Sequence, residues 1–219
     1  MLSAEIGPIT LVGALRGPVE EGDRVQQELE RRKPRTIVLD LSPEELDGLQ
    51  EYFGTGDSEP LVPLSGAEVG LARALSKYSD VRMPSPCFVA AVRWGQREGA
   101  ELVALDENDE SYADLFLKHV GYVDLVRRTR AERGLVRGKY GKVATAEEMA
   151  LLWAERMHRS SGSKRLWNER CSIAARRLKA IAKGPGKAPI VAVIDFERWK
   201  DIRSQLQTVL AEGAPRAPL

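Results

Sequence analysis

Four short apolar runs, each leading into a charged residue, restrict the possible folds of this chain more than any other feature of its sequence. The runs are ITLV from position 9, TIVL from position 36, LVAL from position 102 and IVAVI from position 190. The charged residues that follow them are Arg16, Asp40, Asp106 and Asp195. Short runs that are apolar at every position are typical of strands buried on both faces, as in a parallel sheet. The sequence therefore predicts a central, mainly parallel sheet of about four strands.

Helical segments separate these strands in the manner of βαβ units. Between the first two strands, Val25 and Leu29 stand four residues apart on one face of a polar helix, which Pro34 ends. After the second strand, Ser42 is placed to cap another helix, with Pro43 in its first turn. Parallel neighbours need crossovers of this kind. We therefore expect the α/β class, with helices flanking the sheet.

The segment 121–183 is predicted to be almost entirely helical. Thr145 and Glu148 form a capping box ahead of one of its helices. An apolar stripe at helical spacing follows, made of Trp167, Cys171, Ala174, Leu178 and Ile181. We expect one α/β domain over residues 1–212, with this segment as a helical insertion before the last strand. Residues 213–219 are expected to form a disordered tail.

The net charge of +1 conceals an asymmetry along the chain. Residues 1–120 hold 12 basic and 22 acidic side chains, whereas residues 121–183 hold 16 basic and 6 acidic ones. The basic segment can pack across the acidic one, or it can bind nucleic acid or an acidic protein. No aromatic-interleaved RNA motif and no helix-turn-helix pattern accompanies the charge. Nucleic acid is therefore the less favoured partner.

Composition excludes several classes of protein. Hydrophobic residues at 43% and charged residues at 30% are typical of a soluble globular chain. No apolar run approaches the ~20 residues that a membrane helix needs, and the first ten residues lack the basic start of a signal peptide. Cys87 and Cys171 stand far apart, without metal-ligand spacing. We expect a cytoplasmic protein with no membrane partner, no metal and no other cofactor, while a homo-oligomer stays open.

The carboxyl ends of the predicted strands are the expected place for a functional site, because ligands of open parallel sheets bind outside these ends. Arg16, Asp40 and Asp106 each follow one strand, and Asp195 with Arg198 follows the last. A structural explanation competes with the functional one. Every buried strand must return to water, and charged residues mark where it does so.

Four segments also match, in order, the pattern of a known family. They are TLVGALRGP with the TIVLDLSPEEL that follows it, REGAELVALDENDESY, LWNERCSIAARRLKAI and APIVAVIDFERWKDI. They resemble the TraB/PrgY family, which is grouped with the TIKI proteases, the ChaN-like haem-binding proteins and the erythromycin esterases. The resemblance covers most of the chain and implies an α/β fold shared with metal-dependent hydrolases. The positions that match the family's functional residues are Arg16, Asp40, Asp106, Glu169, Arg170 and Arg198.

The departures from the family pattern bear directly on catalysis. The histidine of the first Gly-x-x-His motif is Arg16 here, and the histidine of the second falls on Arg198. Neutral imidazole binds metals and moves protons near neutral pH, whereas guanidinium has no free lone pair and stays protonated. The sequence therefore argues against a metal centre at these positions, and we lean towards a protein that is not an enzyme. Of the two histidines, His119 is expected to be packed in a helix and His158 to lie on the surface.

The first functional hypothesis is a catalytically degenerate protein that binds by charge. A crevice lined by Arg16, Asp40, Arg170 and Arg198 would hold a small anionic or peptide ligand, because arginine binds carboxylate and phosphate groups in a bidentate manner. The same side chains can instead replace a lost site with ion pairs, Arg16 with Asp40 and Arg198 with Asp106. Both possibilities predict that these residues lie together.

Two further hypotheses come from other classes of function. An active hydrolase could use the carboxylates of Asp40 and Glu169, or Cys87 as a nucleophile. A cysteine nucleophile needs a neighbouring base, and the sequence near Cys87 offers none. Alternatively, the basic helical segment 121–183 could bind nucleic acid or an acidic protein.

Overall fold

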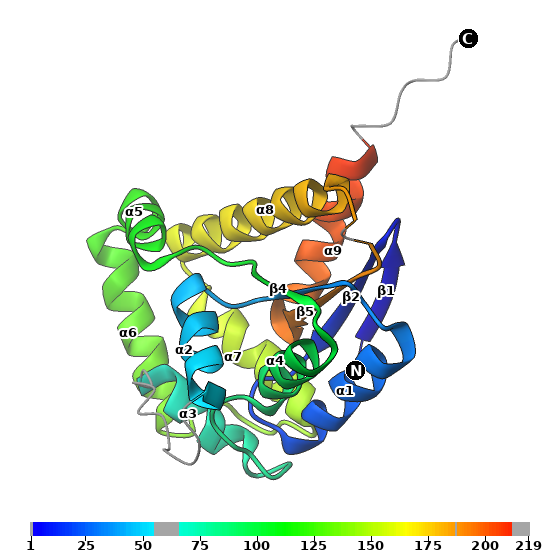
Figure 1. Cartoon of the computed structure of the whole chain (residues 1–219). Helices are drawn as coiled ribbons and strands as arrows, with labels where there is room; N and C mark the ends of the chain where they lie inside the picture. The colour runs from blue at the N-terminus through cyan, green and yellow to red at the C-terminus, as the bar shows by residue number, and fades with distance from the viewer. Residues whose placement is uncertain (1, 55–65, 187, 212–219) are drawn as a thin grey trace.

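The computed structural model describes residues 2–54, 66–186 and 188–211. Its sheet has five strands in the order β1-β2-β5-β3-β4 (Figure 1). The bounds are β1 Leu2–Ile6, β2 Ile9–Ala14, β3 Thr36–Leu39, β4 Glu101–Ala104 and β5 Ile190–Asp195. Neighbours from β2 to β4 pair in parallel, with β5 in the centre. The predicted α/β class with a mainly parallel sheet is confirmed.

Strand β1 is the one strand that the apolar runs do not predict. It pairs with β2 in the antiparallel sense, through a turn in which Gly7 has a φ of +58°. Because β1 lies at the edge of the sheet, several of its side chains face solvent, and Leu2 is 38% exposed. An exposed edge strand carries no continuous apolar run. The other differences are smaller, since β4 begins and ends one residue before its predicted bounds, and β2 and β5 extend two residues and one residue beyond their apolar runs.

Helices account for most of the remaining described residues. Their bounds are α1 Val19–Arg32, α2 Pro43–Gly54, α3 Gly66–Leu75, α4 Pro86–Glu98, α5 Asp109–His119, α6 Tyr122–Val136, α7 Ala146–Met157, α8 Ser161–Lys183 and α9 Phe196–Ala211. The predicted caps are present. Ser42 Oγ accepts a hydrogen bond from the Glu45 backbone N–H at 3.1 Å, and Thr145 Oγ1 accepts one from that of Glu148 at 3.1 Å.

Two helical layers cover the two faces of the sheet (Figure 1). Helices α1 and α4 pack on one face, where Val25 and Leu29 are buried as expected against the strands and Phe88. Helices α8 and α9 pack on the other face. The apolar stripe of α8 is confirmed, because Cys171, Ala174 and Leu178 are fully buried. Helix α9 follows β5 without a loop, so the first turn of α9 starts at the carboxyl end of the central strand.

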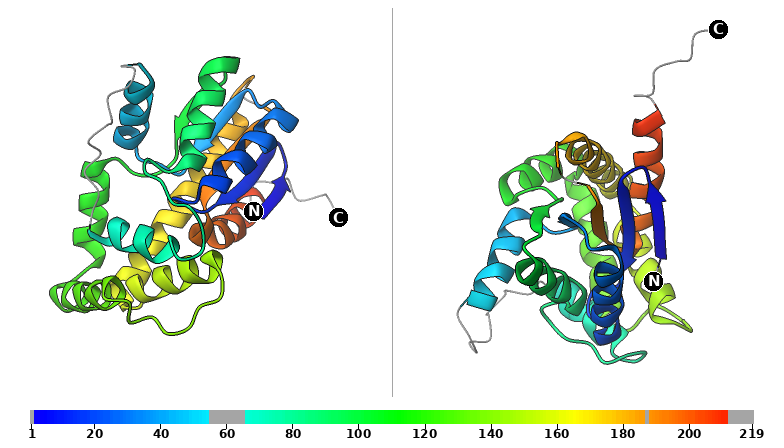
Figure 2. Two further views of the ribbon diagram at one scale, coloured as in Figure 1. Left: turned by 90° about the horizontal axis from the view of Figure 1, so that it is seen from below. Right: turned by 45° about the vertical axis from the view of Figure 1, so that its right-hand side comes forward.

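Helices α3, α6 and α7 form a third packed group beside the sheet (Figure 2). Their shared core includes Leu75, Leu135, Met149 and Trp153. Helices α6 and α7 belong to the predicted basic insertion. The helices on either side of them in the chain, α5 and α8, bring this insertion next to the carboxyl ends of the strands. This arrangement brings side chains of the insertion close to the expected site.

No helix within the described ranges is long and apolar enough to cross a membrane. The predicted tail, residues 213–219, lies outside the described residues.

Candidate functional site

Six charged side chains meet at the carboxyl edge of the sheet, and we call them the edge cluster. They are Arg16, Asp40, Asp106, Arg170, Asp195 and Arg198. Each of the parallel strands contributes through the residues that follow or end it, and α8 contributes Arg170. All four predicted ligand-binding residues, namely Arg16, Asp40, Arg170 and Arg198, therefore lie in one cluster.

Arg16 lies two residues beyond the end of β2 and turns back over the sheet. Its Nε donates to both carboxylate oxygens of Asp195, at 2.7 and 2.9 Å, and its Nη2 donates to the backbone carbonyl of Asp40 at 2.9 Å. Nη1 reaches Glu45 at 3.4 Å, and the guanidinium carbon lies 5.1 Å from the centre of the Phe88 ring. Arg16 thus pairs with Asp195 rather than with the Asp40 carboxylate that one sequence hypothesis assigned to it.

Asp40 is the most enclosed member of the edge cluster, at 0% exposure. Its Oδ1 accepts a hydrogen bond from Arg198 Nη1 at 2.6 Å, and its Oδ2 accepts one from the backbone N–H of Asp195 at 3.1 Å. Burial raises the pKa of Asp40 to about 6, although the charge of Arg198 opposes this shift. Asp40 therefore anchors Arg198 and the first turn of α9 to the end of β3.

The pKa of Asp106 shifts downwards, in the opposite direction to that of Asp40. Arg170 binds it through Nε, 3.3 Å from Oδ1, and through Nη2. Arg198 Nη1 lies 3.3 Å from Oδ2, which is the predicted Arg198–Asp106 contact. Burial alone would raise the pKa of Asp106, but Arg198 and Arg170 outweigh burial and lower it to about 2. This carboxylate stays ionised throughout the neutral range.

Arg177 is a further arginine at this edge that the sequence motifs do not single out. Its Nη1 donates to the backbone carbonyls of Leu105 and Asp106, at 3.0 and 2.7 Å, and its Nη2 donates to Glu107 at 2.9 Å. Arg177 follows Arg170 by seven residues on α8, so both face the end of β4. Its role here is to hold the segment after β4 against α8.

Glu169, the remaining position that matches the family pattern, does not join the edge cluster. Its carboxylate binds Lys118 Nζ at 2.9 Å and His119 Nε2, both on α5. Neighbouring residues of a helix point in directions about 100° apart, so Glu169 and Arg170 cannot both face the strand ends. A hydrolytic pair formed by Asp40 and Glu169 finds no support in this geometry.

The edge cluster does not resemble a metal site. Its three aspartates each bind at least one guanidinium group. Within the described parts of the chain, no group of three or more His, Cys, Asp or Glu side chains is spaced to hold a metal ion. Cys87 is buried at 0% exposure, and burial raises the pKa of its thiol far above the usual value. A neutral thiol of this kind does not act as a nucleophile.

Several buried nitrogen atoms near the edge cluster have no hydrogen-bond partner among the described residues. They are Nε and Nη2 of Arg198, Nη1 of Arg128, Nδ1 of His158 and Nε1 of Trp199. Arg198 is only 3% exposed. Burial lowers the pKa of His158 to about 3, and the positive charges of Arg128, Arg170 and Arg198 add to this shift. Each of these three arginines therefore lies within electrostatic reach of His158, and the interior around His158 is positive.

His158 corrects one expectation from the sequence. It does not lie on the surface but at the carboxyl end of α7, partly buried, with its ring centre 4.4 Å from that of Trp167. His119 is packed at the end of α5, as expected. Helical periodicity within α7 does not place His158, the residue that follows its last turn, because the position of α8 decides what covers this side chain. Arg128 was visible in the sequence only as one of several basic residues in α6.

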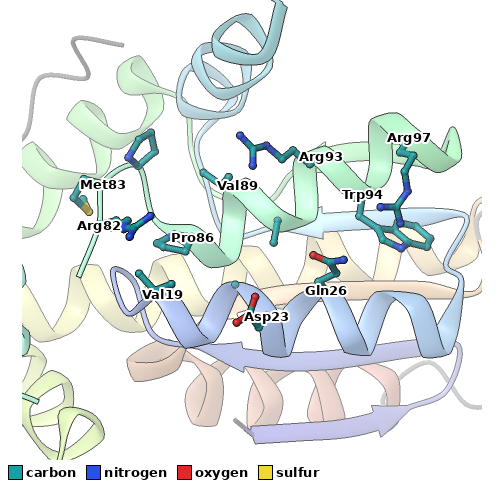
Figure 3. A pocket seen from close by; sticks show the side chains of 13 residues that line it. Val19, Asp23, Gln26, Arg82, Met83, Pro86, Val89, Arg93, Trp94 and Arg97 are labelled. Carbon is teal, nitrogen blue, oxygen red and sulfur yellow. The ribbon is translucent and has the colours of Figure 1, made fainter. Parts of the chain in front are cut away.

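Two pockets lie outside the edge cluster. One, of about 410 Å³, lies along the contact between α1 and α4 and is bordered by Asp23, Arg82, Arg93 and Arg97 (Figure 3). At the surface, Arg82 contacts Asp80 at 3.4 Å and Arg97 contacts Glu98 at 2.7 Å. The other pocket, of about 430 Å³, lies between α7, α8 and α9 and is lined by His158.

No family model matches this chain, and no curated protein matches it in sequence.

Proposed function

We propose that this protein is a divergent relative of the TraB/PrgY group that binds an anionic ligand without metal-dependent hydrolysis. The anionic group, a carboxylate or a phosphate, would be held by Arg198, Arg170 and Arg128. The observation that carries this proposal is the guanidinium of Arg198, which is 3% exposed and has two nitrogen atoms without a partner among the described residues.

Unpartnered buried donors are costly, which is why they point to a ligand. A buried N–H group that loses its partner costs about 1–3 kcal/mol, and more when it belongs to a charged group. Nε and Nη2 lie on one side of a guanidinium, so they can bind two oxygen atoms of one anion. Nη1 of Arg128 is a third buried donor without a partner among the described residues. Arg170, by contrast, donates to Asp106 through Nε and Nη2. An oxyanion would accept hydrogen bonds from the three unpartnered donors of Arg198 and Arg128.

The proposal changes the role of two residues expected to touch the ligand. The donors of Arg16 are taken up by Asp195, Asp40 and Glu45. Asp40 binds Arg198 through Oδ1 and thereby fixes the orientation of its guanidinium. We therefore assign Arg16 and Asp40 to positioning, and the anion to the opposite side of Arg198.

We propose no metal-dependent hydrolysis because of the side chains at the two positions where the family has histidine. Arginine stands at both positions where the resembled family has histidine, and guanidinium neither binds a metal nor takes up a proton. The buried free thiols of Cys87 and Cys171 fit a reducing compartment such as the cytoplasm.

Calorimetric titration with sodium phosphate and sodium acetate, at constant ionic strength, tests the anion site. Saturable binding of at least one of them is expected. Arg128→Gln should weaken it by about tenfold, because a charge-assisted hydrogen bond is lost. Arg176→Gln is the control, since Arg176 is exposed on α8 and donates to Ser172 Oγ at 2.8 Å. Equal affinities for the wild type and Arg128→Gln would overturn the site.

Metal analysis of the purified protein tests the other half of the proposal. Sub-stoichiometric zinc and manganese are expected. One equivalent of either metal that disappears in Asp40→Ala would show that the edge cluster is a metal centre after all.

A further inference from the structure

Four exposed apolar side chains lie close together where α5 is followed by α6, and we call them the corner patch. They are Leu117, Tyr122, Val123 and Leu125, which are 78%, 81%, 60% and 44% exposed. Leu117 lies in the last turn of α5 and the other three lie in the first turn of α6, at the outer left margin of the molecule in Figure 1. Single exposed apolar residues are common on protein surfaces, but a group of this kind indicates contact with another apolar surface.

The exposed charged side chains of α6 are all basic. They are Arg127, Arg130 and Arg133. Arg127 and Arg130 follow Val123 by four and seven residues, so they lie on the same face of the helix as this member of the corner patch. Neither of these two arginines forms an ion pair with another residue that the structure describes. Both guanidinium groups are therefore available to an anionic partner.

The two acidic side chains of α6 are turned away from this face. Asp124 is half-buried against the start of α8, where the Ser160 hydroxyl and the Gly162 backbone N–H bind its carboxylate and lower its pKa. Glu132 is half-buried beside the start of α3, since a Cβ atom on Gly66 would lie 3.4 Å from its Oε1. The exposed face of α6 therefore combines apolar and positive side chains without a negative one.

This combination distinguishes between possible partners. In a symmetric dimer the corner patches of two copies would bring Arg127 and Arg130 close to the same arginines of the other copy, and like charges oppose such a contact. Nucleic acid would attract the arginines, but contacts with phosphates make no use of exposed aliphatic side chains such as Leu117. An anionic partner that also offers an apolar layer satisfies both kinds of side chain.

The shape of the corner favours a flat partner. The two pockets described above are lined by other residues, so neither forms a groove at the corner patch. On the adjoining part of α5, Lys118 binds Glu169 at 2.9 Å, and Asp114 is exposed one turn before Leu117. The excess of positive charge thus lies on α6, directly beside the most exposed apolar side chains.

We propose that the corner patch docks this protein on an anionic membrane surface. Leu117, Tyr122 and Val123 would enter the boundary between headgroups and acyl chains, while Arg127 and Arg130 would contact the lipid phosphates. Tyrosine is a common side chain at this depth. Such a contact needs no helix that crosses the membrane, although it departs from the expectation that the protein has no membrane partner. It also goes beyond the anion site proposed above, because it uses exposed side chains that the anion site does not.

Vesicle binding by the full chain tests this docking. Flotation should recover the protein with vesicles made of equal parts phosphatidylserine and phosphatidylcholine, and at least tenfold less of it with phosphatidylcholine alone. Added salt should weaken the binding, because it screens the arginines from the lipid charge. Failure to bind the mixed vesicles at low ionic strength would overturn the proposal, and so would equal binding to both kinds of vesicle.

The two arginines of the corner are tested together. The double variant Arg127→Gln, Arg130→Gln should weaken binding to the mixed vesicles by about 25-fold, because each basic side chain near an anionic membrane contributes about fivefold. Its matched control is Arg82→Gln with Arg97→Gln, which removes two arginines that are 70% and 57% exposed elsewhere on the surface. Equal losses in the two double variants would mean that only the net charge matters and would refute docking through the corner.

The apolar side chains are tested by Leu117→Ser with Tyr122→Ser. Both side chains are mostly in solvent, so the fold should be unaffected, while binding to the mixed vesicles should fall by more than about tenfold. Leu2→Ser is the control, because Leu2 is 38% exposed on β1, on the opposite side of the sheet in Figure 1. Unchanged vesicle binding in the corner variant would assign the arginines to an acidic protein or a nucleic acid and exclude the membrane.

The corner patch and the anion site fail independently. Leu117→Ser with Tyr122→Ser should leave the titrations with phosphate and acetate unchanged. A protein that binds the mixed vesicles but neither anion would keep the corner patch and lose the anion site.

Discussion

Arg16 and Asp195 are 179 positions apart in the chain, yet both carboxylate oxygens of Asp195 lie within 2.9 Å of Arg16 Nε. The contact joins the ends of the neighbouring parallel strands β2 and β5, where Ala14 is paired with Asp195. Through Asp40, which accepts the Asp195 backbone N–H, the same contact is linked to Arg198. One continuous set of ion pairs and hydrogen bonds therefore closes the carboxyl edge of the sheet from β2 to β4.

Removing the Arg16 guanidinium should destabilise the fold. Arg16→Gln leaves Asp195, whose side chain is 11% exposed, without its counter-charge. Loss of one partner from a buried pair costs about 3 kcal/mol or more, and the 25% exposure of Arg16 places this pair at the lower end of that range. Urea unfolding followed by circular dichroism measures the change.

The matched control for Arg16→Gln is Arg82→Gln. Arg82 and Asp80 form a pair at 3.4 Å in which both side chains are at least 68% exposed, so its loss should change the free energy of unfolding by less than about 1 kcal/mol. Equal losses in the two variants would mean that the Arg16–Asp195 pair is not a structural link.

His158 should make stability depend on pH. Its pKa in the folded protein is about 3, against 6.5 in the unfolded chain, so the unfolded state takes up a proton first as the pH falls. The stability from neutral His158 is complete above pH 6.5 and is lost as the pH falls from there towards 3. Between pH 7 and 5 the wild type should lose about 2 kcal/mol more than His158→Gln.

Nuclear magnetic resonance provides the direct measurement for His158. The ring resonances of a neutral imidazole should persist down to about pH 4, because protonation is opposed by burial and by three nearby arginines. A titration midpoint near 6.5 would instead place His158 in solvent, away from Arg128, Arg170 and Arg198.

Gly13 should tolerate no side chain. A Cβ atom at this position in β2 would lie 2.9 Å from two ring carbons of Trp199 on α9, and Trp199 is itself buried. Gly13→Ala should therefore cost about 1–3 kcal/mol through overpacking. Gly48→Ala is the matched control, because a Cβ there meets nothing within 4 Å and the residue lies within α2.

The control, Gly48→Ala, is expected to stabilise the protein, whereas Gly13→Ala should destabilise it. Alanine in the interior of an exposed helix gains about 0.5–1 kcal/mol over glycine. Thermal unfolding of both variants gives the comparison. A neutral effect of Gly13→Ala would show that α9 can move away from β2, and that the close contact does not fix the position of the edge cluster.

The buried strands and their charged ends were readable from the sequence because the signals are local. The runs before Asp40 and Asp195 are apolar on both faces, and β3 and β5 lie where those runs predict. The α8 stripe around Ala174 was equally clear, since helical periodicity needs only neighbouring residues. Strand β1 gave no such signal because it is exposed at the sheet edge, with Leu2 38% exposed.

The gathering of Arg16, Asp40, Asp106 and Arg198 at one edge also followed from the sequence. All parallel strands point the same way, so whatever follows them meets at the same end. The common direction of the strands does not determine which acid binds which base. Arg16 had Asp40 as its predicted partner and binds Asp195, because partner choice depends on the spacing of strands that are distant in sequence.

By itself, then, the sequence determined the α/β class, the parallel core and the charged carboxyl edge, since apolar runs and helical periodicity are properties of neighbouring residues. Only the tertiary structure decided that Glu169 faces α5, that Arg198 has nitrogen atoms without a partner among the described residues, and that Glu197 lines the same pocket as His158. Each of these outcomes depends on how α7, α8 and α9 pack against one another. Burial and counter-charge arise from that packing, and no local pattern in the chain records them.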